Sequence, residues 1–230
     1  MITPAYEIYK CGYDVYVPRL PGHGTSKNDF IASNSDDWLN VINNAIISLS
    51  KKYIKVNLIG HSMGGCISAI LGCNNSCVNK IIYIAPAFII SYLNDNEYTK
   101  YLKSADTTDY FLNTEKEMSQ SYHPHYENAP CDFDFFWNEY SKYRFPKQLV
   151  ELHKLMKSSQ EIIKDYRHET LFINPLDDID ISVPSAKYYK SLNIENSIIV
   201  DIENGTHCVQ YDINEKTERD TLSAIHKYLK

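Results

Sequence analysis

VNLIGHSMGG (residues 56–65) joins an apolar run to a serine that glycines flank. Its centre, Gly60-His61-Ser62-Met63-Gly64, fits G-x-S-x-G, in which the serine sits on a sharp turn between a strand and a helix. Glycines two positions either side let the backbone pass such a strained turn. The backbone N–H of Met63 then points at the place where an oxyanion would form. The motif predicts that Ser62 is a nucleophile; the alternative is a serine that caps a helix.

Apolar runs rich in β-branched and aromatic residues recur along the chain, at residues 13–17, 54–59, 80–84, 170–173 and 197–202. Runs without polar alternation are typical of strands buried on both faces, as in a parallel sheet. Helical patterns lie between several of them, the clearest at residues 37–53, where Ser35 can cap the start, and at 215–229. This alternation predicts an α/β fold with a mostly parallel sheet flanked by helices.

Residues 88–166 break the alternation, because they carry helical patches and many aromatic side chains but no strand run. We expect them to form a helical cap insertion in a core made of residues 1–87 and 167–230. The aromatic side chains divide between packing and lining a pocket. Such a cap favours acyl groups or aromatic esters over charged substrates.

A serine hydroxyl needs a base to take its proton, and the base needs an acid to fix its tautomer. Three carboxylates follow the predicted strand at 170–173, namely Asp177, Asp178 and Asp180. After the last predicted strand comes Asn-Gly-Thr-His, which places His207 on a turn at the same edge of the sheet. Of the eight histidines, His207 alone lies just beyond a strand end downstream of the acid loop. We therefore predict His207 as the base.

The composition limits the classes of partner. The chain has 230 residues and is 43% hydrophobic, enough for one substantial core. A net charge of -6 without a lysine-arginine cluster argues against nucleic acid or an anionic membrane as the principal partner. Charged residues interrupt the first twenty positions, and no apolar run approaches the length of a membrane span. We expect a cytoplasmic protein without stable membrane insertion, whose six irregularly spaced cysteines are reduced.

We expect no cofactor and no metal. Asp178, Asp180 and Ser182 alternate as calcium ligands do, but Val183 and Tyr189 stand where an EF-hand needs its glycine and its glutamate. The two histidines of His-Pro-His at 123–125 are more typical of a cap loop than of half a metal site.

Taken together, these segments resemble the α/β-hydrolase superfamily, in particular the small bacterial carboxylesterases and monoacylglycerol lipase-like enzymes. GYDVYVPRLPGHG (residues 12–24) resembles the family's fourth strand and the loop after it, and Asp-Asp-Trp at 36–38 the start of its next helix. Asp178 with Ser-Ala at 185–186, and Gly-Thr-His at 205–207, resemble the acid and histidine segments. The resemblance implies Ser62 as nucleophile, His207 as base and Asp178 as acid. Asp180 is the alternative acid, because it also fits a common family spacing.

The resemblance also implies an N-terminally incomplete fold. Residues 1–10 look like the helix between the family's third and fourth strands, so the third strand and its His-Gly-type loop, which supplies a second oxyanion donor, are expected to be missing. Either the chain is a fragment of an esterase or it is a truncated descendant with little activity.

We therefore expect a hydrolase that cleaves small-molecule carboxylic esters through an acyl-enzyme, with short or medium acyl chains or monoacylglycerol-like substrates. A peptidase, thioesterase or acyltransferase on the same triad is the alternative within enzymes. A non-catalytic hydrolase-fold binding protein is the alternative outside them.

Overall fold

The computed structural model describes residues 2–73, 75–113, 137–165, 168–178, 181–212 and 214–230. The chain divides into two compact units. Unit 1 takes Met1–Pro18, Ile42–Ser91 and Leu155–Lys230, and unit 2 takes Arg19–Val41 and Tyr92–Lys154. Each unit is described by itself.

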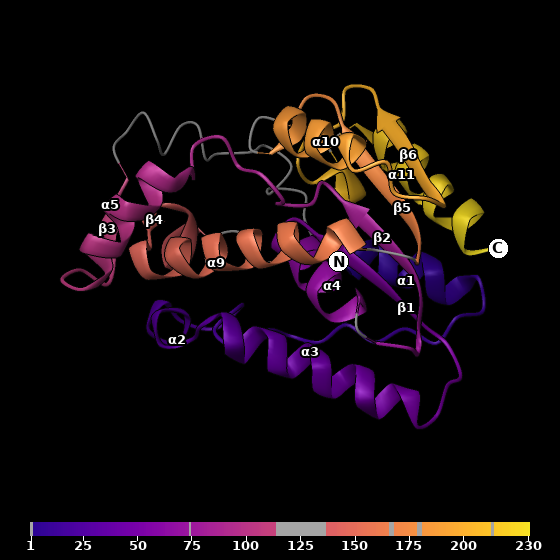
Figure 1. The fold of residues 1–230 in the computed structure, drawn as a ribbon, viewed down its shortest axis with the longest axis horizontal. Coiled ribbons are helices and arrows are strands. Elements are labelled where there is room, and N and C mark those ends of the chain that lie inside the picture. The colour runs from indigo at the N-terminus through magenta and orange to yellow at the C-terminus, as the bar shows by residue number, and fades with distance from the viewer. Residues whose placement is uncertain (1, 74, 114–136, 166–167, 179–180, 213) are drawn as a thin grey trace. The chain divides into compact units, whose positions relative to one another are not determined.

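Unit 1 is built on a parallel sheet of four strands in the order β1-β2-β5-β6 (Figure 1). The strands are β1 (Val56–His61), β2 (Val78–Ile84), β5 (Glu169–Pro175) and β6 (Ser197–Ile202). Parallel neighbours need crossover connections, which here contain helices. The predicted α/β fold with a mostly parallel sheet is therefore confirmed, and four of the five predicted strands are found with shifts of a few residues at most.

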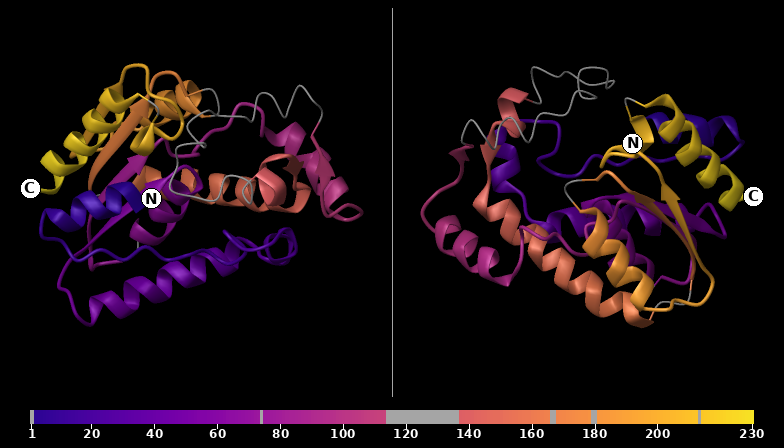
Figure 2. Two further views of the ribbon diagram at one scale, coloured as in Figure 1. Left: turned by 180° about the vertical axis from the view of Figure 1, so that it is seen from behind. Right: turned by 90° about the horizontal axis from the view of Figure 1, so that it is seen from above.

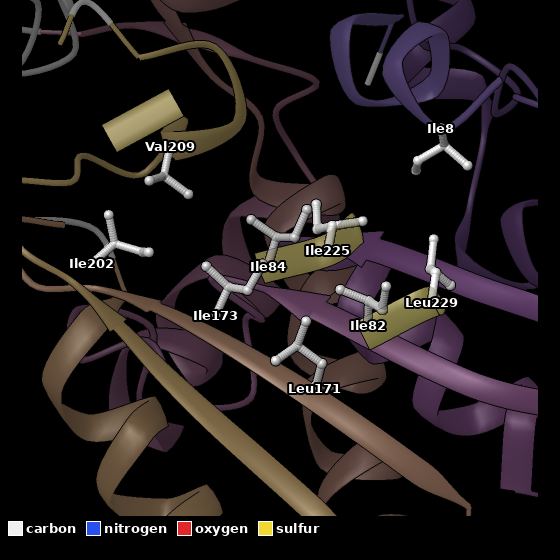
Figure 3. Close-up of a cluster of buried hydrophobic side chains, with 9 residues drawn as sticks. All are labelled: Ile8, Ile82, Ile84, Leu171, Ile173, Ile202, Val209, Ile225 and Leu229. Atoms are coloured by element: carbon white, nitrogen blue, oxygen red, sulfur yellow. The ribbon is translucent and has the colours of Figure 1, made fainter. Parts of the chain in front are cut away.

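One face of this sheet is covered by α1 (Ile2–Lys10) and α11 (Glu215–Leu229), together with the short 3-10 helix η3 (Val209–Tyr211). Alternate residues of a strand point to the same face, so Ile82 and Ile84 of β2 meet Ile225 of α11 in one apolar cluster (Figure 3). Full burial of each such side chain stabilises the fold by roughly 1.5–3 kcal/mol. The ends of the chain are thereby tied to the centre of the sheet.

The opposite face is covered by α4 (Met63–Cys73) and α10 (Ser182–Ser191). Figure 2 shows α10 across the sheet from α1 and α11. The alternate residues of the strands serve this face: the ring centroids of Phe172 and Tyr189 lie 4.5 Å apart. The buried Tyr189 hydroxyl lies 2.6 Å from Oγ1 of Thr170, which satisfies both polar groups inside the core.

The strand predicted at residues 13–17 is wrong. The segment after α1 has no regular secondary structure, and Val15, Tyr16 and Val17 are exposed. An apolar β-branched run forms a strand only where a neighbouring strand supplies ladder hydrogen bonds, and the described residues provide none here. The segment is held through side chains instead: the Tyr13 hydroxyl donates to Leu229 O at 2.6 Å, and the Tyr53 hydroxyl donates to Asp14.

Unit 2 contains α2 (Lys27–Ala32), α5 (Asp95–Ala105), the π-helical turn η1 (Trp137–Ser141) and an antiparallel pair of two-residue strands, β3 (Phe111–Leu112) and β4 (Tyr143–Arg144). Among the described residues, the other helical elements are α3 (Ser35–Ser50), α9 (Pro146–Ile162) and the 3-10 helix η2 (Ile163–Asp165). Within this unit the Tyr140 hydroxyl donates to Gly22 O at 3.1 Å, and Gln148 Nε2 donates to Ser33 O at 3.2 Å. Side chains from 137–154 therefore fix the backbone of 19–41.

The helix predicted at 37–53 is α3, but Ser35 does not cap it. The cap comes from Asn34, whose Oδ1 accepts from the N–H groups of Asp36 and Asp37 at 2.9 and 3.1 Å. The Ser35 hydroxyl donates instead to the carboxylate of Glu151. Both side chains lie in a buried place, so the hydroxyl serves a tertiary contact.

The cap insertion at 88–166 stays a prediction, because residues 114–136 lie outside the described part of the chain. Its described portion holds the short pair β3-β4, which the sequence did not predict. Within the described ranges, no helix is long and apolar enough to cross a membrane.

Candidate active site

Ser62 occupies the sharp turn between β1 and α4, with a left-handed φ of +54°. A serine rarely adopts this conformation unless its surroundings impose it. Backbone hydrogen bonds do so here: Ser62 N donates to Ile84 O at 3.0 Å, and Ser62 O accepts from Gly65 N at 2.9 Å and Ala87 N at 3.0 Å. The serine is therefore held by β2 and the loop after it.

The glycines around the serine differ in what they permit. A Cβ on Gly60 would lie 2.2 Å from Gly64 O, and a Cβ on Gly65 would lie 2.6 Å from Pro86 Cβ. Neither separation is possible, so both positions require glycine. A Cβ on Gly64 would meet open space. The expectation that close approach requires both flanking glycines therefore holds for Gly60 and is wrong for Gly64.

Asp178 and His207 come together at the carboxyl edge of the sheet, after β5 and β6 respectively. His207 Nδ1 donates to Asp178 Oδ2 at 2.9 Å, while Asp178 Oδ1 accepts from Ile181 N at 3.0 Å. The carboxylate side chain is fully buried, and 14% of the imidazole is exposed. Both carboxylate oxygens are thus occupied, and the imidazole is left with Nε2 as its second nitrogen.

A residue downstream of His207 holds the loop that carries it. Asp212 Oδ2 accepts from Thr206 N at 2.7 Å and from Thr206 Oγ1 at 2.8 Å. Asp212 is buried and Thr206 is half-buried, so these charge-assisted bonds are partly shielded from water. Upstream, Asp177 N donates to Gly205 O at 3.0 Å and joins the acid loop to the histidine loop. The backbone on the N-terminal side of His207 is therefore fixed by two separate segments.

His61 holds the same loop from the side of Ser62. Its Nε2 donates to His207 O at 2.8 Å, and the two imidazole rings lie 4.7 Å apart between centroids. Burial lowers the pKa of His61 to about 3, and the neighbouring His207 acts in the same direction. His61 is therefore neutral near pH 7 and acts as a hydrogen-bond donor. Because it precedes Ser62 in the chain, it ties the Ser62 turn to the histidine loop.

The remaining predicted positions fall as follows. Met63 is the first residue of α4, where backbone N–H groups lack partners within the helix. Asp180, the alternative acid, lies outside the described residues, as do His123 and His125. In the described part of the chain, no group of three or more histidine, cysteine or acidic side chains could hold a metal ion.

Sequence reasoning missed His61 and Asp212. His61 stands inside the motif, but the motif gives no sign of the contact that its side chain makes with the His207 loop. For Asp212 the available signal was a carboxylate five positions after His207, just before a helix. Only the three-dimensional structure shows that Asp212 holds the backbone of Thr206.

Comparison with known proteins places this geometry in a family. The family model described as "Serine aminopeptidase, S33" matches residues 3–214. A curated relative, the thermostable monoacylglycerol lipase of Bacillus sp. (strain H-257), is 31% identical over 110 residues. That match spans 45% of this chain and 44% of the relative, so the chain matches less than half of the relative's length.

Solved structures share the fold. The structure reported for LipS and LipT, two metagenome-derived lipolytic enzymes, matches with a TM-score of 0.75 and 18% identity, over 97% of this chain and 86% of the other. The monoacylglycerol lipase of Paleococcus ferrophilus matches with a TM-score of 0.63 and 12% identity, over 85% of this chain and 76% of the other. Since the family model covers nearly the whole sequence, the chain belongs to the serine aminopeptidase S33 family, within the α/β-hydrolases.

Proposed function

We propose that this protein is a serine hydrolase that cleaves carboxylic esters, with Ser62 as nucleophile, His207 as base and Asp178 as acid. The observation that carries the proposal is the 2.9 Å hydrogen bond from His207 Nδ1 to the buried Asp178 carboxylate. Because Nδ1 keeps its proton for Asp178, Nε2 offers its lone pair to a hydroxyl. Ser62 stands on a strained turn next to His61, whose side chain contacts the His207 backbone.

In the first half of the reaction, Ser62 Oγ attacks the ester carbonyl carbon while His207 Nε2 takes the hydroxyl proton. The Met63 N–H donates to the oxyanion of the tetrahedral intermediate, at the N-terminal end of α4. When the intermediate collapses, the bond to the alcohol breaks and His207 returns the proton to the leaving oxygen. Asp178 stabilises the imidazolium that exists between these two proton transfers.

In the second half, water attacks the acyl-enzyme with His207 again as base, which releases the carboxylic acid and regenerates the Ser62 hydroxyl. The neutral His61 does not compete for protons near pH 7, since burial lowers its pKa to about 3. We propose small-molecule substrates with short or medium acyl chains, or monoacylglycerols. The named activity of the Bacillus relative, a monoacylglycerol lipase, supports this class.

A fluorophosphonate probe tests the nucleophile, because it phosphonylates a serine only when a base activates it. The native protein should be labelled at Ser62, and Ser62→Ala and heat-unfolded protein should not be. Absence of labelling in the folded wild type would favour the non-catalytic binding protein. Circular dichroism of Ser62→Ala checks that lost labelling does not reflect lost structure.

A peptidase is the second candidate, because the matching family model is described as a serine aminopeptidase. The same triad cleaves esters and amides, so the pocket and the leaving group decide between them. Purified protein should be offered p-nitrophenyl esters of increasing acyl length, monoacylglycerols and aminoacyl p-nitroanilides. A kcat/KM for the anilides above that for every ester would overturn the esterase and leave the nucleophile assignment intact.

A further inference from the structure

A second pair of reactive side chains lies in unit 1 between α1 and α11. These two helices cover the face of the sheet opposite α10. Cys11 follows the last residue of α1, and its Sγ lies 2.8 Å from Nδ1 of His226 in the last turn of α11. Cys11 is exposed and its thiol is free. One proton is shared between a nucleophilic sulfur and a base, an arrangement typical of activated thiols.

The pair opens into a pocket of about 340 Å³. Its walls are largely apolar and come from both helices, Ile8 on the α1 side and Leu222, Ile225 and Leu229 on the α11 side. Figure 3 shows Ile8, Ile225 and Leu229 within the same apolar cluster. A volume of this size holds a small apolar molecule.

Local charges suit the pair. His226 lies at the C-terminal end of α11, where the helix dipole stabilises a cation. Glu7, which also lines the pocket, forms an ion pair with Lys10 at 2.6 Å. The nearby carboxylate is thus partly neutralised by Lys10 at the mouth of the apolar pocket.

We propose that Cys11 is a covalent-modification site at which the thiol adds to apolar α,β-unsaturated carbonyl compounds bound in this pocket. His226 takes the thiol proton, and the thiolate attacks the β-carbon. A carbon–sulfur bond forms while the carbon–carbon π bond breaks, and its electron pair moves onto the carbonyl as an enolate. The enolate takes the proton back at the α-carbon. The addition has no leaving group and needs no oxidant, and the site is independent of the proposed esterase.

The other described cysteine thiols lack the neighbouring base, the adjoining apolar pocket, or both. Burial raises the pKa of Cys66 to about 12, which suppresses its thiolate. Cys77 donates its S–H to Asn75 Oδ1 at 3.1 Å, and an amide oxygen is not a base that can take the proton. Cys77 is half-buried and does not line the pocket, so it serves as an internal control in the same molecule.

The test compares N-ethylmaleimide with N-octylmaleimide, which present the same reacting group on a short and a long apolar tail. Native protein is treated for short times, and adduct formation at each cysteine is followed by peptide mass spectrometry. Rates are divided by those of glutathione with the same reagent. We expect the normalised rate at Cys11 to exceed that at Cys77 with both reagents, and to be at least about tenfold higher for the octyl than for the ethyl compound, because the longer tail buries more methylene groups.

Two variants separate the base from the pocket. His226→Asn should lower the Cys11 rate about tenfold or more with both reagents, while His168→Asn, away from the pocket, should not change it. Leu222→Asn should abolish the octyl preference and leave the ethyl rate unchanged. Equal normalised rates for the two tails in the wild type, or a Cys11 rate no higher than that of Cys77, would overturn the proposal without reference to any variant.

Discussion

Two histidines of unit 1 make a hydrogen bond through Nδ1, and their surroundings differ in almost every other respect. His207 meets a fully buried carboxylate on a loop, whereas His226 meets an exposed thiol from a regular helix. A hydrogen bond between ionisable groups is stronger in a low dielectric than in water. The first pair is therefore suited to a permanent orientation, and the second to a reaction with a molecule that arrives from solvent.

The two histidines also differ in what holds their backbone in place. Away from its ends, the α11 backbone makes its own hydrogen bonds, so the backbone of His226 is positioned by regular helix. The His207 loop depends on Asp212, His61 and the backbone of Asp177. The loop at the sheet edge lacks such regular backbone bonding around His207, so Asp212 and His61 hold it through their side chains.

Asp178→Asn should produce the largest effect on the buried pair. An amide nitrogen facing Nδ1 favours the opposite tautomer, which puts the proton on Nε2 and removes the base. We expect kcat for an activated ester to fall by about 10⁴-fold with little change in KM. Steady-state assays with p-nitrophenyl esters measure the changes in kcat and KM.

The matched control for that prediction is Asp177→Asn, the same substitution at the exposed neighbouring position. It should retain kcat within about twofold, since surface substitutions away from special features change little. A loss of similar size in both variants would mean that the loop, rather than the Asp178 carboxylate, controls activity. Retained activity in Asp178→Asn would assign the acid to another residue.

The next effect is on stability in acid and concerns His61. Its pKa is about 3 in the folded protein, against an ordinary value of 6.5. Between these values the unfolded chain binds a proton that the native state excludes, so native stability is fully present above pH 6.5 and is lost as the pH falls toward 3. The expected slope is at most about 1.4 kcal/mol per pH unit.

His61→Gln isolates this contribution, because the glutamine Nε2 can still donate to His207 O but does not ionise. Urea unfolding from pH 7 to pH 4 should show a shallower decline for the variant than for the wild type. If the free energy of unfolding declined equally with pH in both proteins, His61 would be protonated in the native state. The loop contact would then not depend on a neutral imidazole.

The third effect is smaller and concerns the attachment of the loop. Thr206→Val removes the hydroxyl that donates to Asp212 and keeps the side-chain volume, whereas Thr206→Ser keeps the hydroxyl. We expect the valine variant to lose about tenfold in kcat, with the stability cost of about 1–3 kcal/mol typical of a broken buried bond to a charged group. The serine variant should lie near the wild type. Equal losses would point to packing of the methyl group instead.

Much of this fold could be predicted from sequence because the buried strands have a strong local signal. The run at 80–84 became part of β2 (Val78–Ile84), whose last four residues are buried, since a continuous apolar run between turns favours a buried strand. The run at 13–17 is also rich in β-branched and aromatic residues, but it formed no strand. A strand exists through its neighbour, and composition does not say whether a neighbour is present.

The candidate site divides in the same way. Ser62, Asp178 and His207 were predicted because a motif and two strand ends mark them; the structure brings Asp178 and His207 into contact, and the catalytic roles stay a prediction. Asp212 and the cap of α3 were missed, because their roles depend on contacts that no short pattern encodes. Ser35 illustrates the reason: its type favours an N-cap, yet its hydroxyl donates to Glu151, more than a hundred positions away. Local preference gave way to a tertiary contact.

The smallest effect is expected at the exposed pair, where it measures how little the thiol–imidazole contact stabilises the fold. Cys11→Ser keeps a donor of similar shape, and water can replace the contact at an exposed site, so the free energy of unfolding should change by less than about 0.5 kcal/mol. Urea unfolding of both proteins at pH 7 measures the difference. A loss of more than about 1.5 kcal/mol, the upper range for a neutral hydrogen bond, would mean that the pair is a structural fastening between α1 and α11. The contrast with His207 would then lie in solvent exposure alone, because both histidines would serve to hold segments together.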